Sequence, residues 1–519
     1  MSGPVRALLI PSALALLVGV AGCTGSPTPN AGGTDDNSSM VLAQAVEPTS
    51  LNPLLGYGAN GAAKIYDGLV AHSADLTLAP ALAEQLPTPS ADGLSWTATL
   101  REGVKFSDGS TFGPEDVVAT YRALLDPATG STVRADFAGL QGVEQLDDRT
   151  VRFALEKPWA AFPHKLVLGI LPSEALGVPL DQVKPVGTGP YQVVEHKRGD
   201  RLQLTANPGF RGGAPGVREL TVVFVPDDNT RAQRMQAGDF DGAELPPRLA
   251  SLAGAASGMR LITHRSADLR AVTLPTGNPV TGDPAIRAAL NAAVNREALV
   301  QSLLGGKGAA ASTPVPETTP EHVDTTASIR HDKARAEQLL DQAGWARGAD
   351  GMRSRDGAPA RFTLMYPIGD VVRNDLATGF AADARAVGVD VQLAGLAWDS
   401  IRPRLGQDAL LWAGGSPFDP DLALTAALRT GNPWGYSDPV VDAALDTGRA
   451  QLDPAQRATA YRQFQRAYVE APAMVVLALV QHTYVVRDNW NGYQQVVDTA
   501  GAGPLSWGPW WNIEKWGSK

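Results

Sequence analysis

The residues that commonly catalyse reactions or bind metals are scattered along this chain of 519 residues. There is no HExxH or GxSxG motif, and the Gly306-Lys307 pair is followed by Gly308 instead of the Ser or Thr of a phosphate-binding loop. The seven histidines show no spacing typical of metal ligands, and a single cysteine excludes an intramolecular disulfide and a cysteine-cluster metal site. The sequence therefore predicts no enzymatic activity, no cofactor and no metal site.

One short stretch, LLWAGGSPFDPD at residues 410–421, carries groups that could hold a ligand or fix a turn. A tryptophan, two glycines, a serine and two prolines surround two aspartates, which is typical of a fixed irregular backbone rather than of a helix or strand. Asp419 lies directly before Pro420, and Asp-Pro is a favoured helix start. One interpretation is therefore that Asp419 caps a helix that begins at Pro420.

The charge balance excludes one class of partner. Lysine and arginine total 44 against 54 acidic residues, a formal net charge of −10, and there are no basic runs interleaved with aromatic residues. Nucleic acid is therefore not an expected partner. With 44% hydrophobic and 19% charged residues the chain is expected to be globular. Its length suggests roughly two to four domains.

The N-terminal residues have the composition of an export segment. Arg6 precedes an apolar run, residues 7–20, which is too short for a membrane-spanning helix and predicts an export signal. The run ends in the sequence VAGC at residues 20–23, which resembles the lipobox of bacterial lipoproteins. The resemblance implies a lipoprotein signal peptide at residues 1–22 and a lipidated Cys23. The alternative is that Cys23 is a chance small residue.

Lipidation would decide where the protein is located. Two or three acyl chains on Cys23 would anchor it stably to the outer face of the cell membrane, because a single chain binds a bilayer only marginally. Residues 24–39 contain no large apolar residue and predict a flexible tether, so residues 23–39 form the lipidated cysteine and its tether. The folded part is expected to begin near Met40.

Strand-like and helix-like patterns alternate after the tether. RTVRFALEKP has apolar residues at positions 151, 153 and 155, and ELTVVFVPD has them at 220, 222 and 224, as half-buried strands do. One long helix is expected from Pro284 to the glycines after residue 304, capped by Asp283. Three further helices are expected to begin at Pro114, after Asp332 and at Pro454.

Several collinear segments carry a family resemblance. LREGVKFSDGSTFGPEDVVATYRALL, residues 100–125, is similar to the signature segment of the family 5 extracellular solute-binding proteins, which serve ABC importers of dipeptides, oligopeptides and nickel. Further segments resemble this family in the same order. They lie at residues 47–70, 185–227, 283–300, 332–345 and 437–451.

The resemblance implies an α/β, two-lobed fold of the periplasmic-binding-protein type, in the large peptide-binding class (type II). Two crossings between the lobes would make a hinge that closes on a ligand. The expected lobe I consists of residues 40–75, 186–275 and 482–519, with an extra subdomain inserted at 76–185. The expected lobe II is residues 276–481.

The resemblance also implies an amine site in the 410–421 turn. Trp412 matches a tryptophan that peptide-binding members place three residues before an aspartate, and that aspartate pairs with the ligand's α-amine. Here position 415 is glycine, and Phe418 lengthens the turn by one residue. Either Asp419 replaces the missing anchor or the ligand has no free amine there, since a buried ammonium needs a partner. The helix-cap interpretation of Asp419 stays open.

A carboxylate site is implied within one residue of Arg373, whose planar fork suits a carboxylate. The alternative is an exposed arginine at a helix start. Aromatic residues could form apolar walls, although any of them could belong to the core instead. The complete set of expected ligand-binding residues is Tyr57, Arg373, Trp398, Trp412, Gly415, Ser416, Phe418, Asp419 and Trp434.

The expected function is that of a lipid-anchored, monomeric binding protein. It would capture peptide-like solutes between its lobes and deliver them to an ABC permease. One alternative is an orphan envelope lipoprotein that acts as a scaffold or regulator. Another is a carrier of metal chelates or heme from the same family.

Overall fold

The computed structural model describes residues 38–500 and 505–519. The predicted signal peptide, Cys23 and the tether up to residue 37 lie outside the described residues. Within the described ranges, no helix has the length and apolar character needed to cross a membrane. Helices and strands alternate along the chain, which confirms the predicted mixed α/β class.

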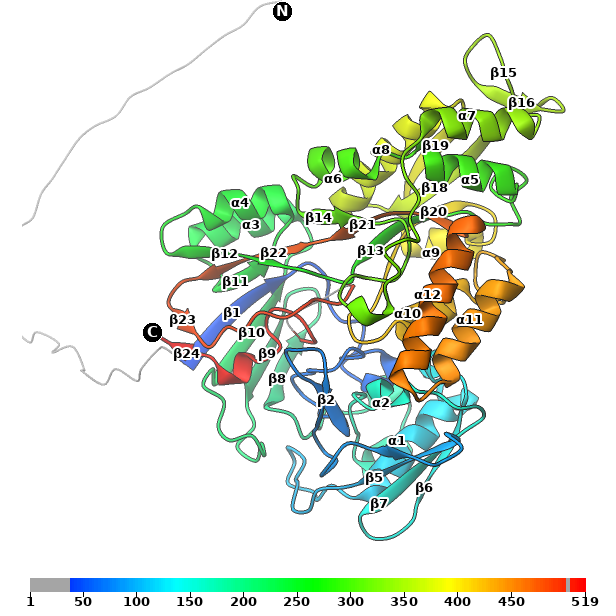
Figure 1. Ribbon diagram of the computed structural model, residues 1–519. Helices are drawn as coiled ribbons and strands as arrows, with labels where there is room; N and C mark the ends of the chain where they lie inside the picture. The colour runs from blue at the N-terminus through cyan, green and yellow to red at the C-terminus, as the bar shows by residue number, and fades with distance from the viewer. Residues whose placement is uncertain (1–37, 501–504) are drawn as a thin grey trace, which may run out of the picture. The chain divides into compact units, whose positions relative to one another are not determined.

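A seven-stranded sheet with the order β12-β22-β11-β1-β10-β9-β8 contains the first described strand (Figure 1). β1 lies between β11 and β10 and is parallel to both. The strands are β1 (Ser39–Gln44), β8 (Tyr191–Lys197), β9 (Arg201–Ala206), β10 (Glu219–Phe224), β11 (Gly242–Glu244), β12 (Met259–His264) and β22 (His482–Arg487). Helices α3 (Asp228–Ala237) and α4 (Pro247–Gly254) bury apolar side chains against this sheet.

A six-stranded sheet has the order β14-β21-β13-β20-β18-β19. Strand β21, which lies between β14 and β13, reads MVVLALV and is buried at every position, because helices cover both faces of the sheet. The strands are β13 (Leu269–Thr273), β14 (Gly308–Ala310), β18 (Arg361–Pro367), β19 (Asp390–Leu396), β20 (Ala409–Gly414) and β21 (Met474–Val480). The covering helices are α5 (Pro284–Ala293), α6 (Arg296–Leu303), α7 (Lys333–Gln342) and α8 (Val371–Ala386) on one face, and α10 (Asp421–Leu428), α11 (Pro439–Ala450) and α12 (Pro454–Glu470) on the other.

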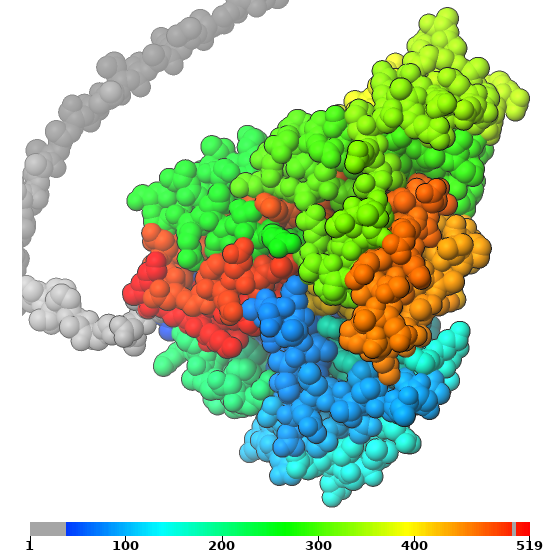
Figure 2. Space-filling model, viewed as in Figure 1, coloured from blue at the N-terminus to red at the C-terminus, as the bar shows by residue number. Residues whose placement is uncertain are grey.

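A four-stranded sheet with the order β4-β5-β7-β6 packs on helix α1 (Pro114–Leu125), and its core continues into that of the seven-stranded sheet. Its strands are β4 (Thr88–Pro89), β5 (Ser95–Thr99), β6 (Leu140–Gln145) and β7 (Thr150–Leu155). Figure 2 shows the orange surface of α11 and α12 lying against the blue and cyan residues of this part. The amide of Ala160 donates to the carbonyl of Arg449 there (2.8 Å).

Shorter elements complete the described chain. They are β2 (Val70–His72), β3 (Leu78–Pro80), β15 (Ala346–Arg347), β16 (Arg353–Arg355), β17 (Ala358–Pro359), β23 (Trp490–Asn491), β24 (Gly517–Ser518), α2 (Phe162–Lys165) and α9 (Trp398–Ile401), with several single 3-10 turns. The predicted strands at 151–155 and 220–224 and the helices beginning at Pro114 and Pro454 are confirmed.

The prediction of one long helix after Asp283 is wrong in one respect. The structure divides it into α5 and α6, because Val294 adopts an extended conformation. Asn295 then accepts a hydrogen bond from the amide of Ala298 (3.0 Å) and caps a new helix. The apolar spacing continues from α5 into α6, so this spacing alone does not show the break before Asn295.

Candidate functional site

The chain passes between the two large sheets at two places that touch. Residues 265–268 connect β12 to β13, and Gln481 alone separates β21 from β22. The crossings are bonded to each other, since the amide of Val480 donates to the carbonyl of Asp268 (2.9 Å) and the Ser266 hydroxyl donates to Val480. β13 pairs with β20 and β21, so the structure places the first crossing before the expected boundary at residues 275–276.

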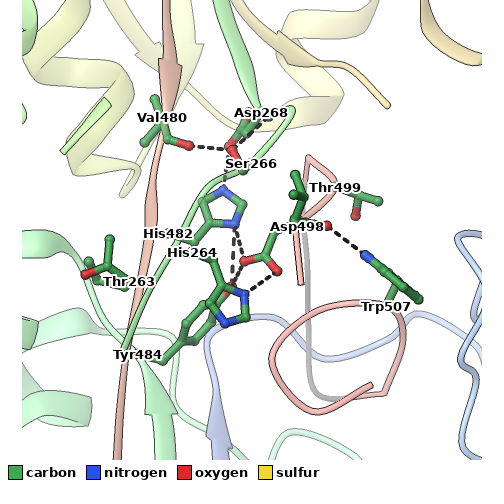
Figure 3. Close-up of polar contacts among 12 residues, drawn as sticks. Thr263, His264, Ser266, Asp268, Val480, His482, Tyr484, Asp498, Thr499 and Trp507 are labelled. Atoms are coloured by element: carbon green, nitrogen blue, oxygen red, sulfur yellow. Dashed lines mark hydrogen bonds and ion pairs between the residues drawn. The ribbon is translucent and has the colours of Figure 1, made fainter. Parts of the chain in front are cut away.

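A buried chain of charged groups lies along these crossings (Figure 3). Asp498 contacts His264 Nδ1 (2.8 Å) and His482 Nδ1 (3.2 Å), and it accepts a hydrogen bond from the hydroxyl of Tyr484 (2.6 Å). His482 Nε2 lies 3.0 Å from a carboxylate oxygen of Asp268. Burial alone would lower the pKa of His482, but the bonds to the two aspartates outweigh it and raise that pKa to about 10. The two crossings, which lie at the position of the expected hinge, therefore hold an imidazolium between two carboxylates.

Because His482 is charged in the folded protein, we expect the free energy of unfolding to depend on pH. The ordinary pKa of histidine is 6.5, so from pH 7 to 8 the folded protein holds a proton on His482 that the unfolded chain has lost. The contribution of His482 to stability is therefore fully present below pH 6.5 and is lost as the pH rises toward 10. The free energy of unfolding should fall by about 1 kcal/mol from pH 7 to pH 8. Above pH 8 the opposite effect of Lys64, whose pKa burial lowers to about 8, offsets this decline.

Urea unfolding of the wild type and of the His482→Gln variant at pH 7 and pH 8 checks this expectation. The variant should lose the decline, whereas replacing the exposed His331 by Gln should keep it. Equal stability of the wild-type protein at both pH values would contradict a charged His482.

A cavity of about 870 Å³ lies beside the hinge and is lined from both large sheets. Its volume is within the range of about 300–1,000 Å³ that small-molecule sites occupy. Residues on the side of the seven-stranded sheet include Gln44, Tyr57 and Glu244. Residues on the side of the six-stranded sheet include Arg270, Arg373 and Trp398.

Two arginines on the six-stranded side have unused hydrogen-bond donors. Arg270 bonds Asp268 through Nη2 (2.5 Å), and Arg373 bonds Asp370 through Nη1 (2.8 Å). The Nε and Nη1 atoms of Arg270 and the Nε atom of Arg373 are buried without an acceptor among the described residues. Burial and the neighbouring Arg270 lower the pKa of Arg373. Such donors beside a cavity suit an anionic ligand group, since buried N–H groups without acceptors are costly.

Three of the nine expected ligand-binding residues line this cavity. Arg373 lies in the first turn of α8, and its guanidinium is 5.9 Å from the ring centre of Trp398. Trp398 is 43% exposed, so part of its side chain is accessible to a ligand. Tyr57 is buried except where it meets the cavity.

The structure brings the other six to a different place. Trp412 and Trp434 pack edge to face with ring centres 6.2 Å apart, and Trp434 donates to the carbonyl of Ala427 (2.6 Å). Phe418 stacks on His72 with ring centres 3.4 Å apart, and its amide donates to the buried Ser416 hydroxyl (3.3 Å). These side chains connect structural elements and do not line the 870 Å³ cavity.

Asp419 is held by an arginine of α12. Its carboxylate forms a two-pronged pair with Arg457, in which Nη2 lies 2.6 Å from one oxygen, and both residues are buried. The same oxygen accepts a hydrogen bond from the amide of Asp421 (2.9 Å), at the start of α10. Burial would raise the pKa of Asp419, but Arg457 lowers it below the ordinary value. The carboxylate of Asp419 thus accepts hydrogen bonds from the start of α10 and from Arg457.

Gly415 lies against the first crossing. A Cβ at this position would be 1.9 Å from the carbonyl oxygen of Ala267, and its φ of +127° is one that side-chain-bearing residues rarely adopt. An aspartate could not occupy this position without moving the hinge. The amine anchor expected at this point from the family pattern therefore has no room.

The sequence reasoning missed Arg270, Gln44 and Glu244. Arg270 did leave a signal, because it interrupts the apolar run LRAVTL of a strand, and a charge within such a run is seldom buried without a purpose. Gln44 and Glu244 are the last residues of short strands, and only the pairing of distant segments brings them to the cavity.

Comparisons with known proteins agree on one family. The family model "Bacterial extracellular solute-binding proteins, family 5 Middle" matches residues 77–436. Protein XP55 of Streptomyces lividans is 43% identical over 503 residues, covering 94% of this chain and 92% of that protein. The oligopeptide-binding protein AppA of Bacillus subtilis is 26% identical over 524 residues, covering 94% and 96%. The crystal structure of NikZ from Campylobacter jejuni in complex with Ni(L-His) superimposes with a TM-score of 0.85 at 26% identity, covering 93% and 100%.

Proposed function

The chain belongs to the bacterial extracellular solute-binding proteins of family 5, and from this we propose that it captures a peptide-like solute in the cavity beside the hinge. It would then present the solute to the membrane permease of an ABC importer. A ligand that contacts both sheets at once favours the closed arrangement, because closure adds contacts that the open arrangement lacks. The permease would recognise the closed arrangement.

The observation that carries this proposal is the unused donors of Arg270 and Arg373 in the cavity wall. A peptide has a terminal carboxylate, and paired guanidinium groups are well suited to such an anion. Trp398 beside Arg373 would supply an apolar surface for a neighbouring side chain. Tyr57 would contribute to the opposite wall.

Native mass spectrometry of the protein purified without denaturation tests the proposal. A set of co-purifying peptides would support a peptide carrier. A single metal chelate would instead favour a carrier like NikZ, which was crystallised with Ni(L-His), and metal analysis would identify it. An empty cavity that no peptide library fills would favour the orphan scaffold.

The location on the membrane is a further part of the proposal, and Cys23→Ser tests it. The substitution removes the thiol that would carry the acyl chains, so we expect the protein to move entirely from the membrane fraction to the soluble fraction. Immunoblotting of fractionated cells measures the distribution. Continued membrane association of the variant would contradict lipidation at Cys23.

A further inference from the structure

The wall of the cavity on the seven-stranded side ends in two hydrogen-bond acceptors. Ala43 of β1 pairs with Ala243 of the parallel neighbour β11. The next residues, Gln44 and Glu244, end their strands, and both line the cavity. Because Gln44 and Glu244 occupy matching positions on neighbouring parallel strands, they lie close together where both strands end. The Oε1 atom of Gln44 is buried without a donor within the described ranges.

Glu244 differs from the other carboxylates of this cavity. Those four are each bonded to a basic side chain at 3.0 Å or less: Glu47 to His196, Asp228 to Arg231, Asp268 to His482 and Asp370 to Arg373. Within residues 38–500 and 505–519, no cation or hydrogen-bond donor reaches the carboxylate of Glu244. The bond that Arg231 Nε makes to this residue ends on its backbone carbonyl (2.8 Å).

An unpaired carboxylate in this position is costly. Burial raises the pKa of Glu244, and the nearby charges of His482 and Arg231 compensate only in part. Asp268 also has one oxygen without a donor, but its other oxygen is bonded to both Arg270 and His482, so its charge is already balanced. A half-buried acid that faces a cavity and lacks a protein partner is best explained by a partner on the ligand.

We infer that Glu244, together with the amide oxygen of Gln44, receives a primary ammonium group of the ligand. The arginines of the opposite wall, Arg270 and Arg373, receive its anionic group. This inference rests on the proposed function and defines the ligand as a zwitterion that spans the cavity. A bound peptide would direct its amino terminus toward the seven-stranded sheet. The position on the other sheet that the family pattern uses for the amine is Gly415, where a side chain has no room.

The test uses the full chain, purified in detergent without denaturation, and tripeptides of alanine, leucine and phenylalanine. Three libraries are compared by calorimetry: one with free termini, one N-acetylated and one C-amidated. Acetylation removes the ammonium, so we expect it to weaken binding to the wild type by at least about 10-fold. Glu244→Gln should weaken binding of the free library by a similar factor, and it should leave binding of the acetylated library unchanged.

Two controls separate a ligand contact from a structural role. Glu219→Gln removes an exposed acid of β10 that bonds Thr205, and it should leave every affinity unchanged. Glu244→Gln should also leave the urea midpoint of unfolding unchanged or raised, because it removes a half-buried carboxylate that forms no ion pair or hydrogen bond with any described residue and whose charge is only partly compensated.

The outcomes distinguish this inference from the proposed function. Equal binding of free and acetylated libraries by the wild type would overturn the inference and leave the proposed function standing. Equal binding of the free library by Glu244→Gln and the wild type would do the same. Failure of the wild type to bind any library would overturn both.

Discussion

Arg457→Gln is expected to lower the free energy of unfolding by about 3–5 kcal/mol, the usual cost of leaving one partner of a buried ion pair alone. Arg457 and Asp419 are both buried, and the guanidinium meets both carboxylate oxygens. Glutamine would replace at most one of these contacts and would leave the negative charge without a counter-ion. Urea unfolding at neutral pH measures the loss.

The chain offers a matched comparison for this variant. Arg429 and Asp446 form the same two-pronged pair, at 2.6 and 3.0 Å, but on the surface. Arg429→Gln should cost less than about 1 kcal/mol, because water stabilises the freed carboxylate. Adding Asp419→Asn to Arg457→Gln should recover part of the loss. Similar losses at both arginines would show that burial is not the cause.

Gly415→Ala is expected to destabilise the protein by about 2–4 kcal/mol, through backbone strain together with a steric clash. The added methyl group would lie 1.9 Å from the carbonyl oxygen of Ala267, within a crossing whose backbone is bonded on both sides. Because that oxygen belongs to the backbone, it cannot move aside as the end of a flexible side chain could. The shift in the urea midpoint of unfolding measures the cost.

Gly431 separates the two causes. Its φ of +101° is also in the region that favours glycine, but a Cβ there would meet no atom within 4 Å. Gly431→Ala should therefore show the backbone cost alone, about 1 kcal/mol. If Gly415→Ala lowers the free energy of unfolding by no more than Gly431→Ala does, the backbone of the crossing moves more easily than its hydrogen bonds imply.

Most of the fold could be predicted because its signals are local. Alternating apolar residues identified β7 and β10, and Pro or Asp at the first positions identified the starts of α1 and α12. The two-lobed α/β fold expected from the collinear segments is confirmed by the superposition on NikZ. The division of one expected helix into α5 and α6 shows the limit, since apolar spacing alone does not reveal that Asn295 acts as a cap.

The candidate site was harder to predict because its partners are distant in sequence. Nothing near Asp419 indicates that Arg457, 38 residues later, will occupy its carboxylate. Glu244 likewise appears as an ordinary strand end until the pairing of β11 with β1 places it beside Gln44 at the cavity. Arg373 was accessible to sequence reasoning because a family pattern marks it. Arg270 interrupts an apolar run and so left a signal, whereas Gln44 and Glu244 require the folded arrangement.

The strand order of the seven-stranded sheet also bears on how the protein is made. β13, β14 and β18–β21 form their sheet from residues 269–480, whereas the seven-stranded sheet joins β1, at residues 39–44, to β22, at 482–487, through β11. While the chain emerges from a ribosome, that sheet has to wait for β22, because contacts between such distant segments form last. The seven-stranded sheet therefore cannot be completed until nearly the whole chain has been synthesised, whereas every strand of the six-stranded sheet is already available.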